Sequence, residues 1–221
     1  MTALLEVQNL SFHYDGRSVF QGLSFTLEPG AAVGLAGPNG SGKSTLLWCL
    51  LGLLKPAAGR VDRRGTVAAV FQNPEDQLFM PSIVEDVALP LINRGLARSE
   101  AEDRAAEALA LVGLKELARR EAAALSLGER KRAAIAAALV SRPDLLILDE
   151  PTSELDPRSA RRLAELLGSL PAARLVASHD MEFLHKTTQR MLILDQGRIA
   201  AQGETPALLN DMDLLVRHGL K

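Results

Sequence analysis

The chain has 221 residues, of which 47% are hydrophobic and 24% are charged, and its formal net charge is −2 at pH 7. This length and composition predict a globular protein with a substantial core, in one large or two small domains. The balanced charge argues against a nucleic-acid partner bound through a general basic surface, because that mode needs clustered Lys and Arg. The single cysteine, Cys49, excludes an internal disulfide and a multi-cysteine metal site.

The hydropathy pattern indicates no secretory signal and no membrane span. The first nine residues lack a basic region followed by an apolar run. The apolar run at 46–51 is far shorter than the roughly 18 residues that a span requires. We therefore expect a soluble protein whose membrane role, if any, comes through a partner, and we expect Cys49 to pack in the core.

The N-terminal part is predicted to form antiparallel strands. Residues 4–7 and 22–27 alternate apolar and polar side chains, which is typical of strands, and Asp15-Gly16 between them is a turn signal.

A glycine-rich segment follows a strand-like stretch at 32–36 and precedes the apolar helical run at 46–51. It matches G-x-x-x-x-G-K-[ST], in which backbone N–H groups and a helix N-terminus cradle phosphates. In that pattern Lys43 reaches the β- and γ-phosphates, and the Ser44 hydroxyl binds Mg²⁺. A turn that holds only a simple anion is the alternative interpretation. We predict a nucleoside triphosphate site made by Gly37, Pro38, Asn39, Gly40, Ser41, Gly42, Lys43, Ser44 and Thr45.

The next region, 72–140, has a helical texture after a predicted strand at 67–71. Ser99-x-x-Glu102 reads as a capping box before a helix that runs to residue 112, and an alanine-rich helix is predicted at 130–140. We interpret 72–140 as a helical subdomain inserted into one domain that spans 1–221.

Strand patterns return at 145–148, 174–178 and 191–195, with Gly197 in the turn behind the last. Strands that alternate with helices predict a mostly parallel sheet covered on both faces. The predicted fold class is therefore α/β: a mostly parallel core, N-terminal antiparallel strands and the inserted helices.

Polar side chains stand at the predicted carboxyl ends of these strands, where open α/β sheets bind ligands. Asp149 is predicted to hold Mg²⁺, and Glu150 to polarise the water that attacks the γ-phosphate. His179 could contact the γ-phosphate, and Gln72 could sense Mg²⁺ or the attacking water. The plain alternatives are acids that cap a turn, a surface histidine and a polar turn residue.

The order of these motifs resembles the ATPase subunits of ATP-binding-cassette (ABC) transporters over essentially the whole chain, with the P-loop NTPase (RecA-like) fold. The resemblance implies that two subunits, as a homodimer or heterodimer, enclose ATP and Mg²⁺. It also implies that Tyr14 stacks on adenine and that Ser126 and Gly128 bind the γ-phosphate held by the opposite subunit. Asp156, in the segment 153–156, matches the loop that joins the two sites across the dimer.

The signature sequence departs from the family pattern Leu-Ser-Gly-Gly-Gln. Leu127 replaces the first glycine and Glu129 replaces the glutamine. Glu129 would place a negative charge near a phosphate, which predicts a weakened half-site but continued hydrolysis.

Residues 71–79 and the tail at 208–220 are similar to the ATPases of energy-coupling-factor (ECF) importers, most of all the cobalt and nickel members. This resemblance implies an integral membrane coupling protein and a substrate-capture membrane protein as partners, at the cytoplasmic face of a prokaryotic membrane. An ECF vitamin importer, such as one for biotin, is an alternative. So are a soluble ABC ATPase of DNA repair or ribosomes, and a switch that binds ATP without turnover. Scattered histidines and acids indicate no site for a transported metal ion.

A stretch after Gln72 combines apolar and acidic residues. Glu75, Asp76, Glu85 and Asp86 surround Leu78, Phe79, Met80, Ile83 and Val84. This pattern suggests a socket with an apolar floor and an acidic rim for a basic helix of the membrane partner. The alternative is an ordinary core with a solvated acidic face.

Overall fold

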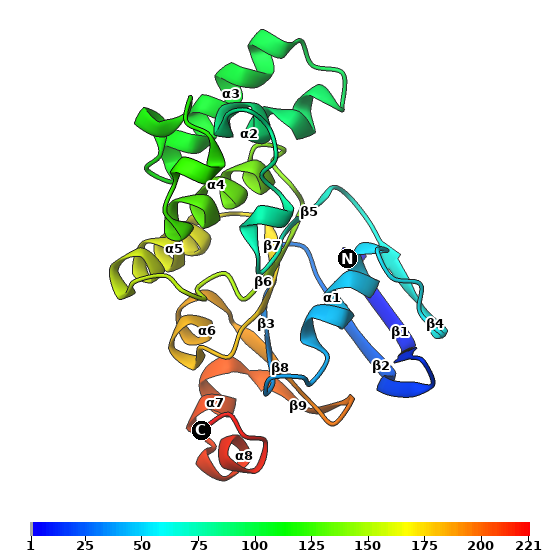
Figure 1. Ribbon diagram of the computed structural model, residues 1–221. Coiled ribbons are helices and arrows are strands. Elements are labelled where there is room, and N and C mark those ends of the chain that lie inside the picture. Colours follow the sequence, from blue (N-terminus) through cyan, green and yellow to red (C-terminus); the bar gives the residue numbers. More distant parts are fainter. Residues whose placement is uncertain (1) are drawn as a thin grey trace.

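The computed structural model describes residues 2–221 and contains two sheets with helices around them (Figure 1). The larger sheet has six strands in the order β5-β6-β7-β3-β8-β9, and the smaller sheet has three in the order β2-β1-β4. The strands are β1 (Leu5–Tyr14), β2 (Arg17–Leu27), β3 (Ala32–Ala36), β4 (Ala58–Arg63), β5 (Val67–Val70), β6 (Leu145–Asp149), β7 (Ala173–Ala177), β8 (Arg190–Asp195) and β9 (Arg198–Glu204).

The helices cover the larger sheet and form a cluster at one end of the molecule (Figure 1). They are α1 (Lys43–Leu51), α2 (Ile83–Ile92), α3 (Arg98–Leu111), α4 (Leu127–Leu139), α5 (Pro157–Ser169), α6 (Met181–Thr187), α7 (Thr205–Asn210) and α8 (Met212–Arg217). Short 3₁₀ turns occur at Pro74–Asp76, Lys115–Leu117 and Ala122–Ala124. No helix within residues 2–221 combines the length and the apolar character needed to cross a bilayer.

The larger sheet confirms the predicted α/β class. Five of its strands pair in parallel, and only β9 runs antiparallel, to β8. On the buried strand β6, Leu145 and Ile147 enter one hydrophobic core, whereas Leu146 and Leu148 enter the other. This alternation follows from the two-residue repeat of a strand, and it means that both faces of the sheet are covered.

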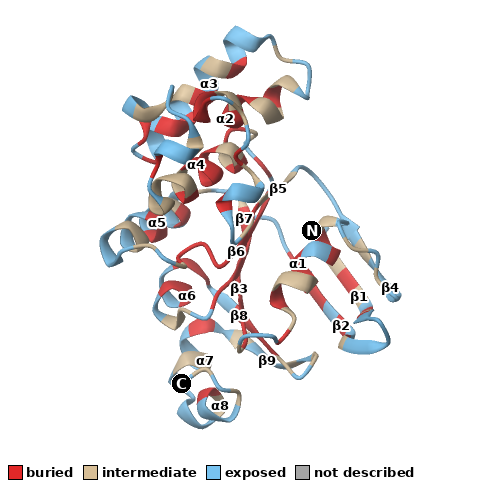
Figure 2. Ribbon diagram, viewed as in Figure 1, coloured by how far each residue is buried: buried red, intermediate tan, exposed pale blue. Residues whose placement is uncertain are grey.

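The two cores lie on opposite faces of the larger sheet, and their buried segments appear red in Figure 2. One core joins this sheet to α1 and the three-stranded sheet, and the other joins it to the remaining helices. Cys49 of α1 is 2% exposed, and burial raises the pKa of its thiol to about 11. The thiol is therefore protonated at neutral pH and packs as a small apolar group, as predicted.

The hairpin between β1 and β2 turns at the predicted place. Asp15 and Gly16 have φ angles of 46° and 80°, and two positive φ angles in a two-residue loop match the twist of antiparallel strands. The sequence did not predict β4, because its side chains do not alternate between apolar and polar. Its side chains are mostly exposed, and it pairs with β1.

The predicted capping box at Ser99 is wrong. Helix α3 begins at Arg98 with Ala97 at the N-cap, and no side chain caps it. The carboxylate of Glu102 instead pairs with Arg98 at 3.7 Å and Arg119 at 3.3 Å, so it is not free to bond back to the backbone. The capping box of this region lies at Ser126 and Glu129, at the start of α4.

Candidate functional site

The glycine-rich segment 37–42 forms the loop between β3 and α1, as the pattern predicts. Two of its glycines are required by the geometry. A Cβ on Gly37 would overlap the carbonyl oxygen of Leu194, and Gly42 combines a φ of 99° with a hypothetical Cβ only 2.8 Å from Val19. The backbone can therefore hold this tight curve only without side chains at these positions.

Lys43 opens α1 and folds back over the loop. Its Nζ donates hydrogen bonds to the carbonyl oxygens of Gly37 at 2.8 Å and Pro38 at 3.2 Å. Its side chain is 7% exposed, and burial lowers the pKa of Lys43, although the carboxylates of Glu150 and Asp149 oppose this shift. A buried ammonium within this loop is suited to meet an anion there.

The two acids that end β6 lie beside the loop. Glu150 Oε1 is 3.8 Å from Lys43 Nζ, and Ser44 lines the same cleft as Asp149. Strand β6 is separated from β3 only by β7, and all three are parallel, so their carboxyl ends meet at one edge of the sheet.

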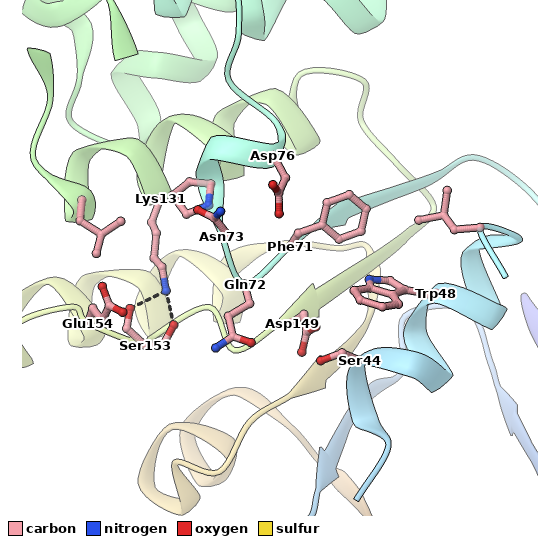
Figure 3. A pocket seen from close by; sticks show the side chains of 13 residues that line it. Ser44, Trp48, Phe71, Gln72, Asn73, Asp76, Lys131, Asp149, Ser153 and Glu154 are labelled. Atoms are coloured by element: carbon pink, nitrogen blue, oxygen red, sulfur yellow. Dashed lines mark hydrogen bonds between the residues drawn. The ribbon is translucent and has the colours of Figure 1, made fainter. Parts of the chain in front are cut away.

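Asp149 has the properties of a ligand for a hard cation. It is 3% exposed, and its Oδ1 atom has no hydrogen-bond partner in the structure. Burial raises the pKa of Asp149, and the nearby Ser44 hydroxyl opposes this shift. Ser44, Asp149 and Gln72 line one cleft of about 560 Å³ (Figure 3). Oxygen ligands of this kind fit Mg²⁺, which prefers one or two carboxylates together with substrate phosphates.

Glu150 is held in an unusual backbone conformation. Its φ is 46°, and left-handed backbone is uncommon for a residue with a side chain. Its Oε2 is 2.9 Å from His179 Nδ1 and accepts a hydrogen bond from the buried Ser178 hydroxyl at 3.2 Å. The imidazole of His179 remains 61% exposed. The carboxylate is thus oriented between Lys43 on one side and His179 on the other.

Lys131, in α4, was not singled out by the sequence analysis. It is 3% exposed, and its Nζ donates to the carbonyl oxygen and the hydroxyl of Ser153 (Figure 3). The same Nζ donates to the carbonyl oxygen of Glu150. The sequence feature that could have indicated its burial is the helical spacing of α4, which places Lys131 on the same face as the buried Ile135 and Ala138. A lysine on a buried helical face requires acceptors, but the sequence does not say which ones.

Ser126 and Gly128 lie at the start of α4, and no hydrogen bond within residues 2–221 joins Ser126 to the glycine-rich loop at 37–45, the P-loop. Ser126 is the N-cap, and within residues 2–221 it bonds only to Glu129 and Arg130 of its own helix. The backbone N–H of Ser126, followed by its hydroxyl, lowers the pKa of Glu129. Glu129 therefore carries its charge at the helix N-terminus at neutral pH.

Two further predicted positions lie apart from this cluster. Tyr14 ends β1, is 45% exposed and packs edge-on against Phe12 with ring centroids 4.8 Å apart. Val19, across the same hairpin, meets Gly42 of the P-loop. Asp156 is the N-cap of α5 and accepts bonds from the backbone N–H groups of Arg158 and Ser159. Its carboxylate therefore has a structural function inside the chain.

The loop between β3 and α1, with two carboxylates beside its lysine, defines the class of P-loop ATPases. The family model described as ABC transporter matches residues 20–153, and the chain belongs to this family. An ABC transporter ATP-binding protein of Gloeobacter violaceus is 43% identical, over 98% of this chain and 96% of that protein. The energy-coupling factor transporter ATP-binding protein EcfA of Methanothermobacter thermautotrophicus is 39% identical, over 99% of this chain and 76% of that protein.

Solved structures agree with this assignment. CbiO1 of Clostridium perfringens, part of the ABC transporter complex CbiONQ, has a TM-score of 0.83 and 30% identity, and covers 100% of this chain and 96% of that chain. The dimeric ATP-binding cassette MJ0796 bound to ADP and Pi has a TM-score of 0.83 and 27% identity, and covers 91% and 98%. The chain is an ABC transporter ATPase. Members of this family dimerise, hydrolyse ATP and work with membrane components.

Proposed function

We propose that this chain is the ATPase subunit of an ECF-type importer, with cobalt or nickel ions as the transported substrate. The observation that carries the proposal is the fit to CbiO1 over the full length of this chain, together with the 39% identity to an ECF ATPase. A membrane coupling protein and a substrate-capture protein complete the importer, and this subunit binds at the cytoplasmic face. Within residues 2–221 no group of three or more His, Cys, Asp or Glu is placed to hold a metal ion.

The proposed chemistry assigns each half of the site to a different subunit. Lys43 and the P-loop backbone bind the ATP phosphates. Asp149, Ser44 and Gln72 would hold Mg²⁺, which neutralises phosphate charge. Glu150 accepts the proton of the attacking water, and His179 orients that carboxylate and meets the γ-phosphate. Ser126 and Gly128, at the start of α4, contact the ATP of the opposite subunit.

The helical segment 72–140 transmits the motion, and it carries a groove that suits a partner helix. The groove has a volume of about 380 Å³ and lies between edge strand β5, α2 and α4. Phe79, on its rim, is 68% exposed, and the charged residues that line the groove are Asp76, Arg94 and the buried Asp86. An exposed aromatic beside a carboxylate suits a helix with apolar and basic residues.

The structure corrects the acidic rim that the sequence suggested. Asp86 is 3% exposed and accepts hydrogen bonds from the backbone N–H groups of Phe79 and Met80, both at 2.9 Å. Glu85 accepts from the Ser82 hydroxyl and pairs with Arg98. Ile83 and Val84 are buried core residues. Only part of the predicted socket therefore faces outward.

We expect Asp76→Lys combined with Phe79→Ser to uncouple the subunit from its membrane partner. The change reverses a charge and removes an exposed aromatic, and both contribute to recognition at an interface. Co-purification with the transmembrane component and substrate uptake by cells should both fall sharply. Because Asp76 also lines the cleft of Ser44 and Asp149, the basal ATPase is compared in Phe79→Ser alone, which should stay close to wild type. Glu165→Lys, on the exposed face of α5, is the matched charge reversal and should assemble normally. A double variant that assembles and transports would refute the groove as the docking site.

The substrate is tested separately from the ATPase. Cells that lack their own importer would receive the subunit with the membrane proteins encoded beside it. Uptake of radioactive cobalt or nickel that stops with Glu150→Gln supports the proposal. Biotin uptake in place of metal uptake would assign the complex to the vitamin importers, and no dependence of either on this subunit would contradict an ECF function.

We expect Glu129→Gln to raise ATPase activity. The Glu129 carboxylate carries a charge where the partner's γ-phosphate is proposed to bind, and glutamine removes this charge while its amide oxygen can still accept from Ser126. The gain should be modest and should shrink as salt is added, because exposed charges are screened. Steady-state phosphate release at several salt concentrations measures it.

Glu129→Ala serves as the control for this prediction. It removes the charge and also the hydrogen bonds to the backbone N–H and hydroxyl of Ser126. If the glutamine variant loses activity, the hydrogen bonds from Ser126 to the carboxylate contribute more to the ATPase rate than the repulsion between the carboxylate and phosphate takes away.

A further inference from the structure

Lys131 links two functional segments of one chain. It lies on α4 roughly one and a half helical turns after Ser126, the N-cap. Its Nζ is 3.3 Å from the Glu150 carbonyl oxygen and bonds to both the carbonyl and the hydroxyl of Ser153. One ammonium thus ties the helix that begins with Ser126 to the loop that carries Glu150.

The acceptor is the peptide group that sets the direction of the Glu150 side chain. Glu150 has its φ at 46°, a left-handed conformation that is strained for an L-residue. Its carbonyl oxygen accepts from Ser153 N at 3.1 Å, from Ser153 Oγ at 2.9 Å and from Lys131 Nζ. Lys131 is the only one of these three donors that comes from outside the turn itself.

A purely packing role does not account for a charge at this position. Burial lowers the pKa of Lys131, and the acidic groups that oppose the shift are Glu154, Glu150 and Asp149. The neighbouring buried residues of α4 are alanines and Ile135, so an apolar side chain would satisfy the helix without desolvating a charge. The ammonium is held by acceptors of the loop that follows β6, and its function concerns that loop.

We propose that Lys131 is a positioning residue that couples the contact of α4 with the partner's ATP to the placement of Glu150 at the chain's own ATP. This inference rests on the proposed roles of Ser126 and Glu150. When the opposite subunit engages the start of α4, that helix is fixed, and Lys131 fixes the Glu150 peptide with it. Each subunit then hydrolyses its own ATP only after its α4 has met the ATP of the other.

The first test separates positioning from binding. Lys131→Met keeps the length of the stem and removes the charge. We expect kcat for ATP to fall about 10- to 100-fold, as for a group displaced by about 1 Å, with KM unchanged and with partial recovery in Lys131→Arg. Lys186→Met, which removes an exposed lysine from α6, should match wild type. A wild-type kcat in Lys131→Met, or a raised KM with normal kcat, would overturn the inference. If Lys131→Met does not fold, Ser153→Ala replaces it, because the Ser153 hydroxyl bonds both Lys131 and Glu150, and its kcat should fall several-fold.

The second test asks in which subunit Lys131 acts. Lys131→Met protein is mixed with a large excess of Glu150→Gln protein before ATP is added, so that each Lys131→Met chain pairs with a chain that has an intact lysine but no base. Hydrolysis of the one ATP bound by each Lys131→Met chain should stay slow in a single-turnover measurement, whereas wild type in the same excess should hydrolyse its bound ATP at the normal rate. Restored activity in the mixture would show that Lys131 acts across the dimer and would refute the inference. Normal hydrolysis by Glu150→Gln alone would instead refute the proposed base.

Discussion

Replacing Glu150 with glutamine should leave ATP binding intact and slow hydrolysis about 10²- to 10⁴-fold, which is the usual contribution of general acid–base catalysis. The amide keeps the size of the side chain but cannot accept a proton from water. Phosphate release by the purified variant measures the loss, and titration with a fluorescent ATP analogue measures the binding.

The surroundings of Glu150 explain why binding should survive. The backbone of this residue is fixed by Ala177 and Ser153, and these bonds do not involve the carboxylate. The carboxylate itself meets Lys43 at 3.8 Å and His179 at 2.9 Å. Removal of its charge leaves the ammonium of Lys43 free for phosphate, so ATP affinity should stay equal to wild type or rise.

The variant should also accumulate as an ATP-bound dimer, since hydrolysis is the step that removes the bridging phosphate. Size exclusion with ATP present reports this species. Glu182→Gln, an exposed residue of α6 that pairs with Lys186, is the control and should hydrolyse ATP at the wild-type rate. Near-normal turnover in Glu150→Gln would remove this residue from the catalytic role.

The parts of the site that could be predicted from sequence are those set by local pattern and by parallel topology. The P-loop lies between a strand and a helix that are its neighbours in the sequence. Its position could therefore be predicted without knowledge of long-range contacts. Asp149 and Glu150 were expected beside it because parallel strands end at one edge of the sheet, and the contacts of Ser44 and Lys43 agree.

The parts that were missed depend on partners distant in sequence. Lys131 meets a loop about twenty residues further on, and that contact is set by the packing of α4 against the end of β6. Strand β4 was missed because its sequence shows little apolar alternation. Backbone hydrogen bonds to β1 hold it in the sheet, while its side chains stay exposed.

The two capping-box patterns show how tertiary contacts decide between equal local signals. Ser99-x-x-Glu102 and Ser126-x-x-Glu129 have the same spacing, but only the second forms the reciprocal bonds. Arg98 and Arg119 pair with the carboxylate of Glu102, whereas the carboxylate of Glu129 hydrogen-bonds, within the described residues 2–221, to Ser126 alone. The charge of Glu129 therefore acts at the start of α4.

Replacing Lys43 with alanine should impair nucleotide binding itself, whereas Glu150→Gln impairs only the hydrolysis that follows binding. Hydrogen bonds to charged groups contribute about 1.5–3 kcal/mol, so the loss of the ammonium should weaken ATP affinity roughly 10- to 100-fold. Titration with a fluorescent ATP analogue in the presence of Mg²⁺ measures this change.

The buried position of Lys43 makes a second variant necessary for this prediction. Its Nζ also bonds to the carbonyl oxygens of Gly37 and Pro38, so alanine could weaken the loop as well as the phosphate contact. Lys43→Met fills the same space, and a melting temperature close to wild type would show that the loop is kept. If Lys43→Met still loses ATP affinity, the charge is responsible, because the stem and its packing remain. Unchanged affinity in both variants would contradict the assignment of Lys43 to the β- and γ-phosphates, whatever the effect on turnover.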